Sequence, residues 1–383
     1  MAKSSHRSPG EGSIYQTTDG RWRGAITISG RGTQTRRVVS GRSRAEVAAK
    51  LDVARRNSAS GVYAGRQTVG DYLARWLQAE KQRVRASTWQ ERESHTRLYI
   101  VPAMGRVPLA RLTPLDVESM TAALVARGLS PRTAAHCRVS LRRALGDAQR
   151  DGLVARNVAA LARPPRIPSR GLEAGRDYLD ATDLRRLLSA AKVHPLGPLF
   201  TLAATTGLRQ GELLGLSWGD VDAERRTLTV RRSLARAHGG GWALAEPKTA
   251  RSRRTIHLPS AAVAALERHR DLQNVAHVAA GGAWQNVDQL AFTDTIGRPL
   301  GGSYVSHAFH RLLDAAGLPS IPFHGLRHSA ASALLAQGVP LIEVSRMLGH
   351  STISITADTY SGVTPERMRD AADAMDRALG GAS

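Results

Sequence analysis

Several features are scarce in this chain of 383 residues, and each scarcity excludes a class of protein. The one cysteine, Cys137, excludes a disulfide framework within the chain and suits a reducing compartment, so we expect it to be a small core residue. No apolar run approaches the roughly 18 residues of a membrane-spanning helix, and the first twelve residues lack the apolar core of a secretory signal. The sequence therefore predicts a cytoplasmic protein with no membrane partner.

Acidic residues are also few: 32 Asp and Glu stand against 54 Lys and Arg, which leaves a net charge of +22. The pI near 11.3 indicates a polyanionic partner. Nucleic acid is the first candidate and an anionic membrane surface the second. Lysine is scarcer still, because arginine supplies 49 of the 54 basic residues. Lysine can release a proton near neutral pH whereas arginine cannot, so a lysine such as Lys248 attracts interest as a proton donor.

The length predicts two or three domains, and 42% hydrophobic residues suffice for folded cores. Two stretches have linker composition: residues 58–66 are small and polar, and residues 163–175 are rich in Pro, Gly and Arg. We therefore expect an N-terminal domain with its linker over 1–65, a second over 66–170 and a third over 171–383. Their net charges are +8, +11 and +3, so most of the positive charge lies in the first two.

The first domain is predicted to be a three-stranded sheet with one helix. Strands are expected over 13–17, 21–29 and 34–39, with a turn at Asp19-Gly20, and a helix over 43–56. Alternation divides the middle strand into a face of Trp22, Gly24, Ile26 and Ile28 and a face of Arg21, Arg23 and Thr27. Such a sheet fits a DNA major groove, with Arg21 and Arg23 as candidate contacts. Ordinary solvated charge is the alternative interpretation of these arginines.

The second domain is predicted to be a basic bundle of about four helices between Thr68 and Ala162. Thr113-Pro114 and Ser130-Pro131 are typical helix starts, with the first residue as N-cap and proline in the first turn. The helix after Ser130 is expected to bury Ala134, Val139, Leu141 and Leu145 and to expose Arg138, Arg142 and Arg143. Arg138 and Arg142 are candidate DNA contacts.

The third domain is predicted to be mainly helical, beginning with a helix over 178–192 and interrupted by a strand-rich insert over 227–258. The predicted fold class is thus multidomain and mainly α with small β parts: a three-stranded sheet plus helix, a helical bundle, and a mixed, mainly-α domain with a β insert.

Four short stretches of the third domain carry side chains suited to phosphodiester chemistry. Two arginines, Arg209 and Arg327, can clamp phosphate oxygens, and Tyr360 can attack phosphorus. His324 and His350 can bind the phosphate or assist the phenol, and Lys248 can protonate a departing sugar oxygen. The stretches contain no acidic cluster for Mg²⁺, and we expect neither cofactor nor metal. His324 and His328 have the spacing of zinc ligands, but the glutamate of an H-E-x-x-H motif is absent.

Four motifs follow one another in order, TGLRQGEL, EPKT, HGLRH and LGHS, and Tyr360 comes after them. With these motifs the chain resembles the tyrosine recombinase (phage integrase) family over nearly its whole length. The resemblance implies a catalytic set of Arg209, Lys248, His324, Arg327, His350 and Tyr360. Glu212 is interpreted as a buried partner that orients its turn. The family's integrases carry an arm-type DNA-binding domain, a core-binding domain and a catalytic domain, which matches the three predicted here.

The resemblance implies integration or excision of a mobile element through a 3′-phosphotyrosine intermediate. It also implies double-stranded DNA attachment sites as substrate, a homotetramer on DNA, an accessory directionality or host DNA-bending factor, and a location at the bacterial nucleoid. Two alternatives remain: a type IB-like DNA topoisomerase, and a non-enzymatic DNA-binding regulator.

Overall fold

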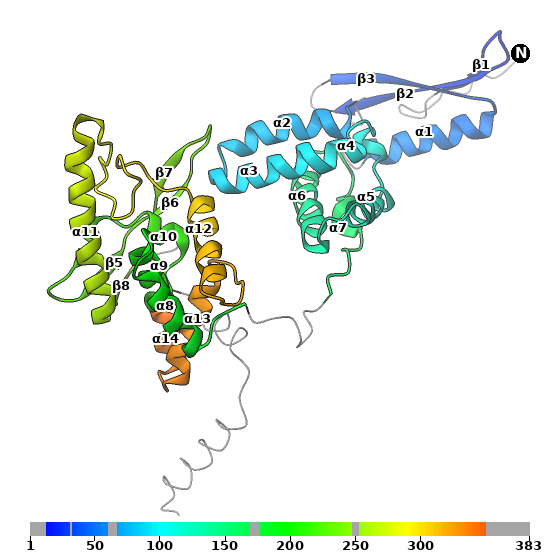
Figure 1. Cartoon of the computed structure of the whole chain (residues 1–383). Helices are drawn as coiled ribbons and strands as arrows, with labels where there is room; N and C mark the ends of the chain where they lie inside the picture. Colours follow the sequence, from blue (N-terminus) through cyan, green and yellow to red (C-terminus); the bar gives the residue numbers. More distant parts are fainter. Residues whose placement is uncertain (1–12, 31–32, 60–66, 169–176, 247–252, 350–383) are drawn as a thin grey trace, which may run out of the picture. The chain divides into compact units, whose positions relative to one another are not determined.

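The structure is a computed structural model, and it describes residues 13–30, 33–59, 67–168, 177–246 and 253–349. The chain divides into two compact units, Met1–Ser169 and Arg170–Ser383. The boundary between them in sequence falls within the stretch of linker composition at 163–175. Helices with small antiparallel sheets make up both units, which confirms the predicted fold class (Figure 1). Among the described residues, no helix is long and apolar enough to span a membrane.

The chain begins with an antiparallel sheet in the order β1-β2-β3, followed by a helix. The strands are β1 (Ser13–Gln16), β2 (Trp22–Gly30) and β3 (Thr33–Gly41), and α1 (Arg44–Ala59) packs against them. The hydroxyl of Ser43 accepts a hydrogen bond from the Glu46 amide at 3.2 Å, as its predicted N-cap role requires. The helix extends three residues beyond the predicted end at Arg56, so it includes Ser58 and Ala59, which we had assigned to a linker.

The two faces of β2 differ as predicted. Ile26 is buried against Val47 and Leu51 of α1, and Trp22 packs at the edge of this small core. Gly24 is required on this face, because a β-carbon there would lie 2.7 Å from the side chains of Val47 and Leu51. Arg21, Arg23 and Thr27 are exposed.

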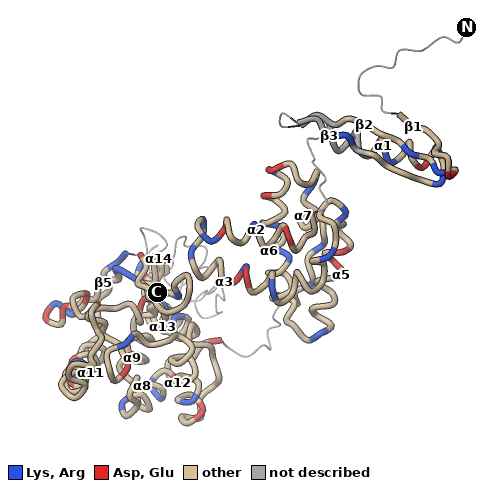
Figure 2. The backbone as a smooth tube through the Cα atoms, turned by 90° about the horizontal axis from the view of Figure 1, so that it is seen from above, with Lys and Arg blue, Asp and Glu red and all other residues tan. Residues whose placement is uncertain are grey.

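Residues 67–168 form the predicted helical bundle. Its longer helices are α2 (Val69–Lys81), α3 (Ala86–His95), α5 (Pro114–Ala126) and α6 (Pro131–Arg150); α4 (Val101–Met104) and α7 (Val158–Leu161) are short. Both predicted helix starts are confirmed, since Thr113 caps α5 in a capping box with Asp116 and the Ser130 side chain accepts from the Thr133 amide. Figure 2 shows basic positions along several of these helices.

Helix α6 corrects two expectations about which side chains point inward. Its buried stripe contains Ala134, Cys137, Leu141, Ala144, Leu145 and Ala148. Val139 is 55% exposed, so its predicted burial is wrong. It lies two residues from both Cys137 and Leu141, which places it on the opposite side of a helix with 3.6 residues per turn. Arg138 is only partly exposed, because its guanidinium donates two hydrogen bonds to the Ala162 carbonyl, at 2.8 and 3.1 Å.

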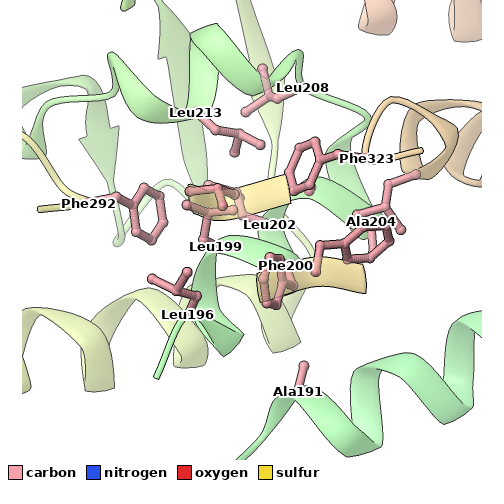
Figure 3. Close-up of a cluster of buried hydrophobic side chains, with 14 of the residues drawn as sticks. Ala191, Leu196, Leu199, Phe200, Leu202, Ala204, Leu208, Leu213, Phe292 and Phe323 are labelled. Carbon is pink, nitrogen blue, oxygen red and sulfur yellow. The ribbon is translucent and has the colours of Figure 1, made fainter. Parts of the chain in front are cut away.

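The second unit is built around α9 (Gly197–Thr206), which is buried along most of its length. It packs against α8 (Ala181–Ala191), α11 (Ser260–Ala280) and α13 (Gly325–Ala336), and α12 (Gly302–Ala315) contributes to the same core. Figure 3 shows Phe200 and Phe323 of this core together with Leu199, Leu202, Leu208 and Leu213. The first helix begins three residues later than predicted, because the Asp180 side chain caps the amides of Thr182 and Asp183.

The predicted β insert forms two small antiparallel sheets. One has the order β4-β5-β8 and the other pairs β6 with β7. The strands are β4 (Val221–Asp222), β5 (Thr227–Val230), β6 (Ser233–Arg236), β7 (Trp242–Ala245) and β8 (Arg254–His257). The last described helix is α14 (Leu341–Leu348), whose Val344 and Leu348 pack against Ala331 and Leu335 of α13 (Figure 1).

Candidate active site

The turn between α9 and α10 (Gln210–Leu214) presents Arg209. Helix α9 ends at Gly207, whose φ of 63° lies in the left-handed region that favours glycine. A β-carbon at Gly207 would lie 2.5 Å from Leu348 Cδ2, so glycine also permits close approach of α14. Gln210 fixes the turn from the other side, since its amide nitrogen donates to the Gly302 carbonyl at 2.9 Å and contacts Ser306 Oγ at 3.0 Å.

Glu212 is the buried partner that orients this turn, as predicted. Its carboxylate accepts from the Arg209 amide at 3.0 Å and from Arg209 Nη1 at 2.8 Å. A second arginine, Arg254 of β8, donates through Nη2 to Oε2 at 2.9 Å. Burial alone raises the pKa of Glu212, but the hydrogen bonds and charges of Arg254 and Arg209 outweigh it and hold this pKa below its usual range. Glu212 is therefore an anion shared by two guanidinium groups.

Arg327 approaches the same turn from α13. Its side chain is 2% exposed, and Nη1 donates to the Gly207 carbonyl at 2.9 Å, two residues before Arg209. A contact between segments 120 residues apart thus brings Arg327 to the turn that carries Arg209, the other arginine predicted to clamp a phosphate. Arg209 retains 39% of its side-chain exposure, so it is much less enclosed than Arg327.

His324 lies immediately before α13, on the same side as these arginines. Loss of hydration lowers the pKa of His324 to about 4, and the positive charges of Arg327 and Arg209, with that of His328 when it is protonated, act in the same direction. The imidazole is therefore neutral at physiological pH, with one nitrogen that donates and one that accepts.

The end of α14 is tied to this cluster by two arginines. Arg209 Nη2 donates to the Gly349 carbonyl at 3.3 Å, and Arg254 Nε donates to the Met347 carbonyl at 2.6 Å. Cations at the last carbonyls of a helix satisfy acceptors that have no partner within the helix. Gly349 adopts a φ of 70° against Arg254, where a β-carbon would lie 2.9 Å from Nη1.

Three of the six predicted catalytic residues are therefore found together: Arg209, His324 and Arg327. The other three, Lys248, His350 and Tyr360, lie outside the described residues. Of the predicted DNA contacts, Arg21, Arg23 and Arg142 are exposed, whereas the guanidinium of Arg138 is engaged with Ala162. Where the chain is described, no group of three or more His, Cys, Asp or Glu side chains gathers as metal ligands. His324 and His328 meet edge to face, with ring centroids 5.3 Å apart.

Arg254 is a residue of this site that the sequence motifs do not identify. The signal was present in the alternation of β8. Arg254 shares its face with Ile256 and Leu258, which are 3% and 4% exposed, and its own side chain is 7% exposed. An arginine at an inward position of a strand predicts a buried carboxylate partner.

A family model described as the phage integrase family matches residues 177–367, and one described as its N-terminal SAM-like domain matches residues 68–123. A tyrosine recombinase XerC-like protein of Caldanaerobacter subterraneus is 31% identical over 80% of this chain and 82% of its own length. An integrase of Streptomyces ambofaciens is 31% identical over 94% of each chain.

The chain belongs to the phage integrase family of tyrosine recombinases. It is accordingly a site-specific recombinase of the integrase type. Solved structures of this fold include the Tn1549 transposon integrase in complex with a circular intermediate DNA, with a TM-score of 0.68 and 22% identity over 81% of this chain and 99% of that one. A lambda integrase tetramer bound to a Holliday junction has a TM-score of 0.58 and 20% identity over 89% of this integrase and 96% of that chain.

Proposed function

We propose that this integrase cleaves and rejoins DNA at the cluster of Arg209, His324 and Arg327. The observation that carries the proposal is the charge of this cluster. Arg209 and Arg254 both pair with Glu212, and Arg327 donates to the Gly207 carbonyl of the same turn, so among the described residues three guanidinium groups meet beside one carboxylate and leave an excess of positive charge. A phosphodiester supplies the missing negative charge, and two arginines can stabilise the further charge that develops on its oxygens during displacement.

In the proposed reaction, the Tyr360 hydroxyl attacks the phosphorus and the 5′-oxygen departs. Lys248, as the general acid, donates its proton to the departing 5′-oxygen, so that a 3′-phosphotyrosine and a free 5′-hydroxyl result. The 5′-hydroxyl of a partner strand then attacks the phosphotyrosine and releases the tyrosine. The number of phosphate ester bonds is unchanged, so no external energy source is needed. His324 and His350 assist by hydrogen-bonding the phosphate oxygens or the attacking phenol.

The assignment of Lys248 is tested by changing the leaving group. Lys248→Ala should slow cleavage of ordinary DNA, because an alkoxide leaves poorly without a proton. A substrate with a bridging 5′-sulfur leaves as a thiolate and needs no proton, so it should restore the rate of the variant. Absence of rescue would remove Lys248 as the general acid.

The front of the chain supports the same function. We assign residues 1–65 to arm-type DNA binding, 66–170 to core-site binding and 171–383 to catalysis. Arg21 and Arg23 on the exposed face of the sheet, and Arg142 on α6, are the proposed DNA contacts. Double-stranded attachment sites of a mobile element are the proposed substrate, bound by a tetramer with the help of a directionality or DNA-bending factor. Deletion of residues 1–65 should spare binding to the core site and abolish integration that depends on arm sites.

Tyr360→Phe separates the proposal from its alternatives. The variant should bind the attachment site as wild type does and form no covalent complex on a denaturing gel. A DNA-binding regulator would form no covalent complex even as wild type. A type IB-like topoisomerase would form one and relax supercoiled DNA, yet yield no recombinant product from two sites. Recombination by the phenylalanine variant would show that the nucleophile is another residue.

A further inference from the structure

We propose that Arg254 is a positioning residue that holds the end of α14 in register with Arg209. The inference rests on the proposed function and adds a residue to it. In the reaction proposed above, Arg254 pairs with Glu212 and has no contact with the phosphate.

The guanidinium of Arg254 joins three segments of the chain. Nε donates to the Met347 carbonyl at the end of α14, while Nη1 and Nη2 lie 3.3 and 2.9 Å from the two oxygens of Glu212 in α10. Arg254 itself belongs to β8. Three elements that are separate in sequence therefore meet at one planar group, and 93 residues separate Arg254 from Met347.

In sequence, the elements that Arg254 joins are next to residues proposed for catalysis. Lys248 precedes Arg254 by six residues, and His350 directly follows Gly349. Glu212 also binds Arg209, and Arg209 Nη2 donates to the Gly349 carbonyl, so the contacts close a ring of Glu212, Arg254, α14 and Arg209. Because displacement of a reacting group by about 1 Å can cost on the order of 100-fold in rate, a fixed ring at this point has kinetic value.

The ring of contacts among Glu212, Arg254, α14 and Arg209 is closely packed. The side chain of Arg254 is 7% exposed and that of Glu212 is 5% exposed. Gly349 packs on the guanidinium so closely that a β-carbon would lie 2.9 Å from Nη1 and 3.1 Å from Cζ. Arg254 therefore cannot shift without a shift of the end of α14.

Arg254→Lys is the test variant, because it keeps the charge opposite Glu212. A lysine ammonium is a single point of charge and does not reproduce the planar fork that reaches Glu212 and Met347 together. The matched control is Arg186→Lys in α8. Arg186 also joins a carboxylate, Asp183, to helix-end carbonyls, those of Ala316 and Gly317, in the same unit.

The measurement is single-turnover cleavage of a nicked duplex carrying the core site mapped with wild type, at saturating protein, together with the Kd for that duplex. We expect Arg254→Lys to cleave about 10- to 100-fold more slowly with an unchanged Kd, and Arg186→Lys to match wild type in both. A purely structural role would instead raise the Kd and lower the unfolding temperature, with a normal rate at saturation. That outcome, or a wild-type rate in Arg254→Lys, would overturn the proposal.

Gly349→Ala provides a second route if Arg254→Lys does not fold. Its β-carbon displaces the guanidinium while every charge is retained, and Gly338→Ala, at a φ of 79° with nothing within 4 Å, controls for backbone strain. Only Gly349→Ala should slow cleavage at saturation; equal rates in the two variants would contradict the inference. Failure of the recombinase proposal has a different signature, because wild type would then form no covalent complex or Tyr360→Phe would still form one.

Discussion

Glu212 and Arg254 form a buried ion pair, with Oε2 and Nη2 2.9 Å apart, and Glu212 also pairs with the less enclosed Arg209. The pair explains why an acidic residue stands inside a site that is otherwise positively charged. Glu212 neutralises one arginine and orients another, and it leaves Arg209 and Arg327 as the groups with charge to offer a phosphate.

The buried pair predicts a large effect of Glu212→Gln on stability. Removing one partner leaves the other charge buried without compensation, which typically costs about 3–5 kcal/mol. We expect a loss of this size in the free energy of unfolding, measured by urea denaturation. Glu246→Gln is the control, since its pair with Arg253 is exposed and such pairs contribute about 1 kcal/mol or less. Equal losses in the two variants would contradict the account of Glu212.

His324 predicts a pH dependence of stability. Its pKa in the folded chain is about 4, whereas an ordinary histidine titrates near 6.5. Between these values the unfolded chain binds a proton that the folded chain does not, so stability falls as pH decreases from about 6.5 to 4. His324→Gln lacks this contribution, and its stability should decline less steeply over that window. Parallel pH profiles, or an NMR titration of His324 near pH 6.5, would contradict the expectation.

Gly207 predicts a packing cost beyond backbone strain. Alanine at Gly338 incurs only the cost of a left-handed backbone, about 1–2 kcal/mol. Alanine at Gly207 also adds a β-carbon 2.5 Å from Leu348 Cδ2. Overpacking of a core costs about 1–3 kcal/mol more in the free energy of unfolding. Denaturation of both variants measures the difference. If Gly207→Ala is no less stable than Gly338→Ala, α14 does not pack on the turn as described.

Arg142 predicts a change in the salt dependence of DNA binding. It is exposed on α6, in a groove lined also by Val139, Arg143 and Arg150. If Arg142 contacts one phosphate, Arg142→Ala should reduce the slope of log K against log salt by about 0.9. Arg298→Ala, which removes an arginine already paired with Asp294, should leave the slope unchanged. An unchanged slope in Arg142→Ala would remove this residue from the interface.

Local features of the structure were predictable from the sequence. The N-caps at Thr113 and Ser130, the faces of β2 and the buried role of Glu212 depend on residues within a turn or strand of one another, so their spacing is visible in the chain. Val139 shows the limit of this reasoning, because an apolar residue was assumed to point inward although its phase on α6 opposes that of Cys137 and Leu141.

Tertiary contacts were not predictable in the same way. The bonds from Arg209 to Gly349 and from Arg327 to Gly207 join positions 140 and 120 residues apart, and no local pattern encodes such pairs. The engagement of Arg138 with Ala162 and that of Arg254 with Met347 belong to the same class. The resemblance to the family predicts that Arg209, His324 and Arg327 lie together, whereas the identity of the partners of Arg254, Glu212 and Met347, required the structure.

The most direct test of the central claim is to identify the residue that becomes joined to DNA. Wild-type protein trapped on a nicked attachment-site duplex is digested with nuclease and trypsin, and the peptides are sequenced by mass spectrometry. The account predicts one modified peptide, residues 347–367, with a 3′-phosphonucleotide on Tyr360, its only tyrosine. A nucleotide on any other residue, or a trapped complex with no covalent link, would contradict it.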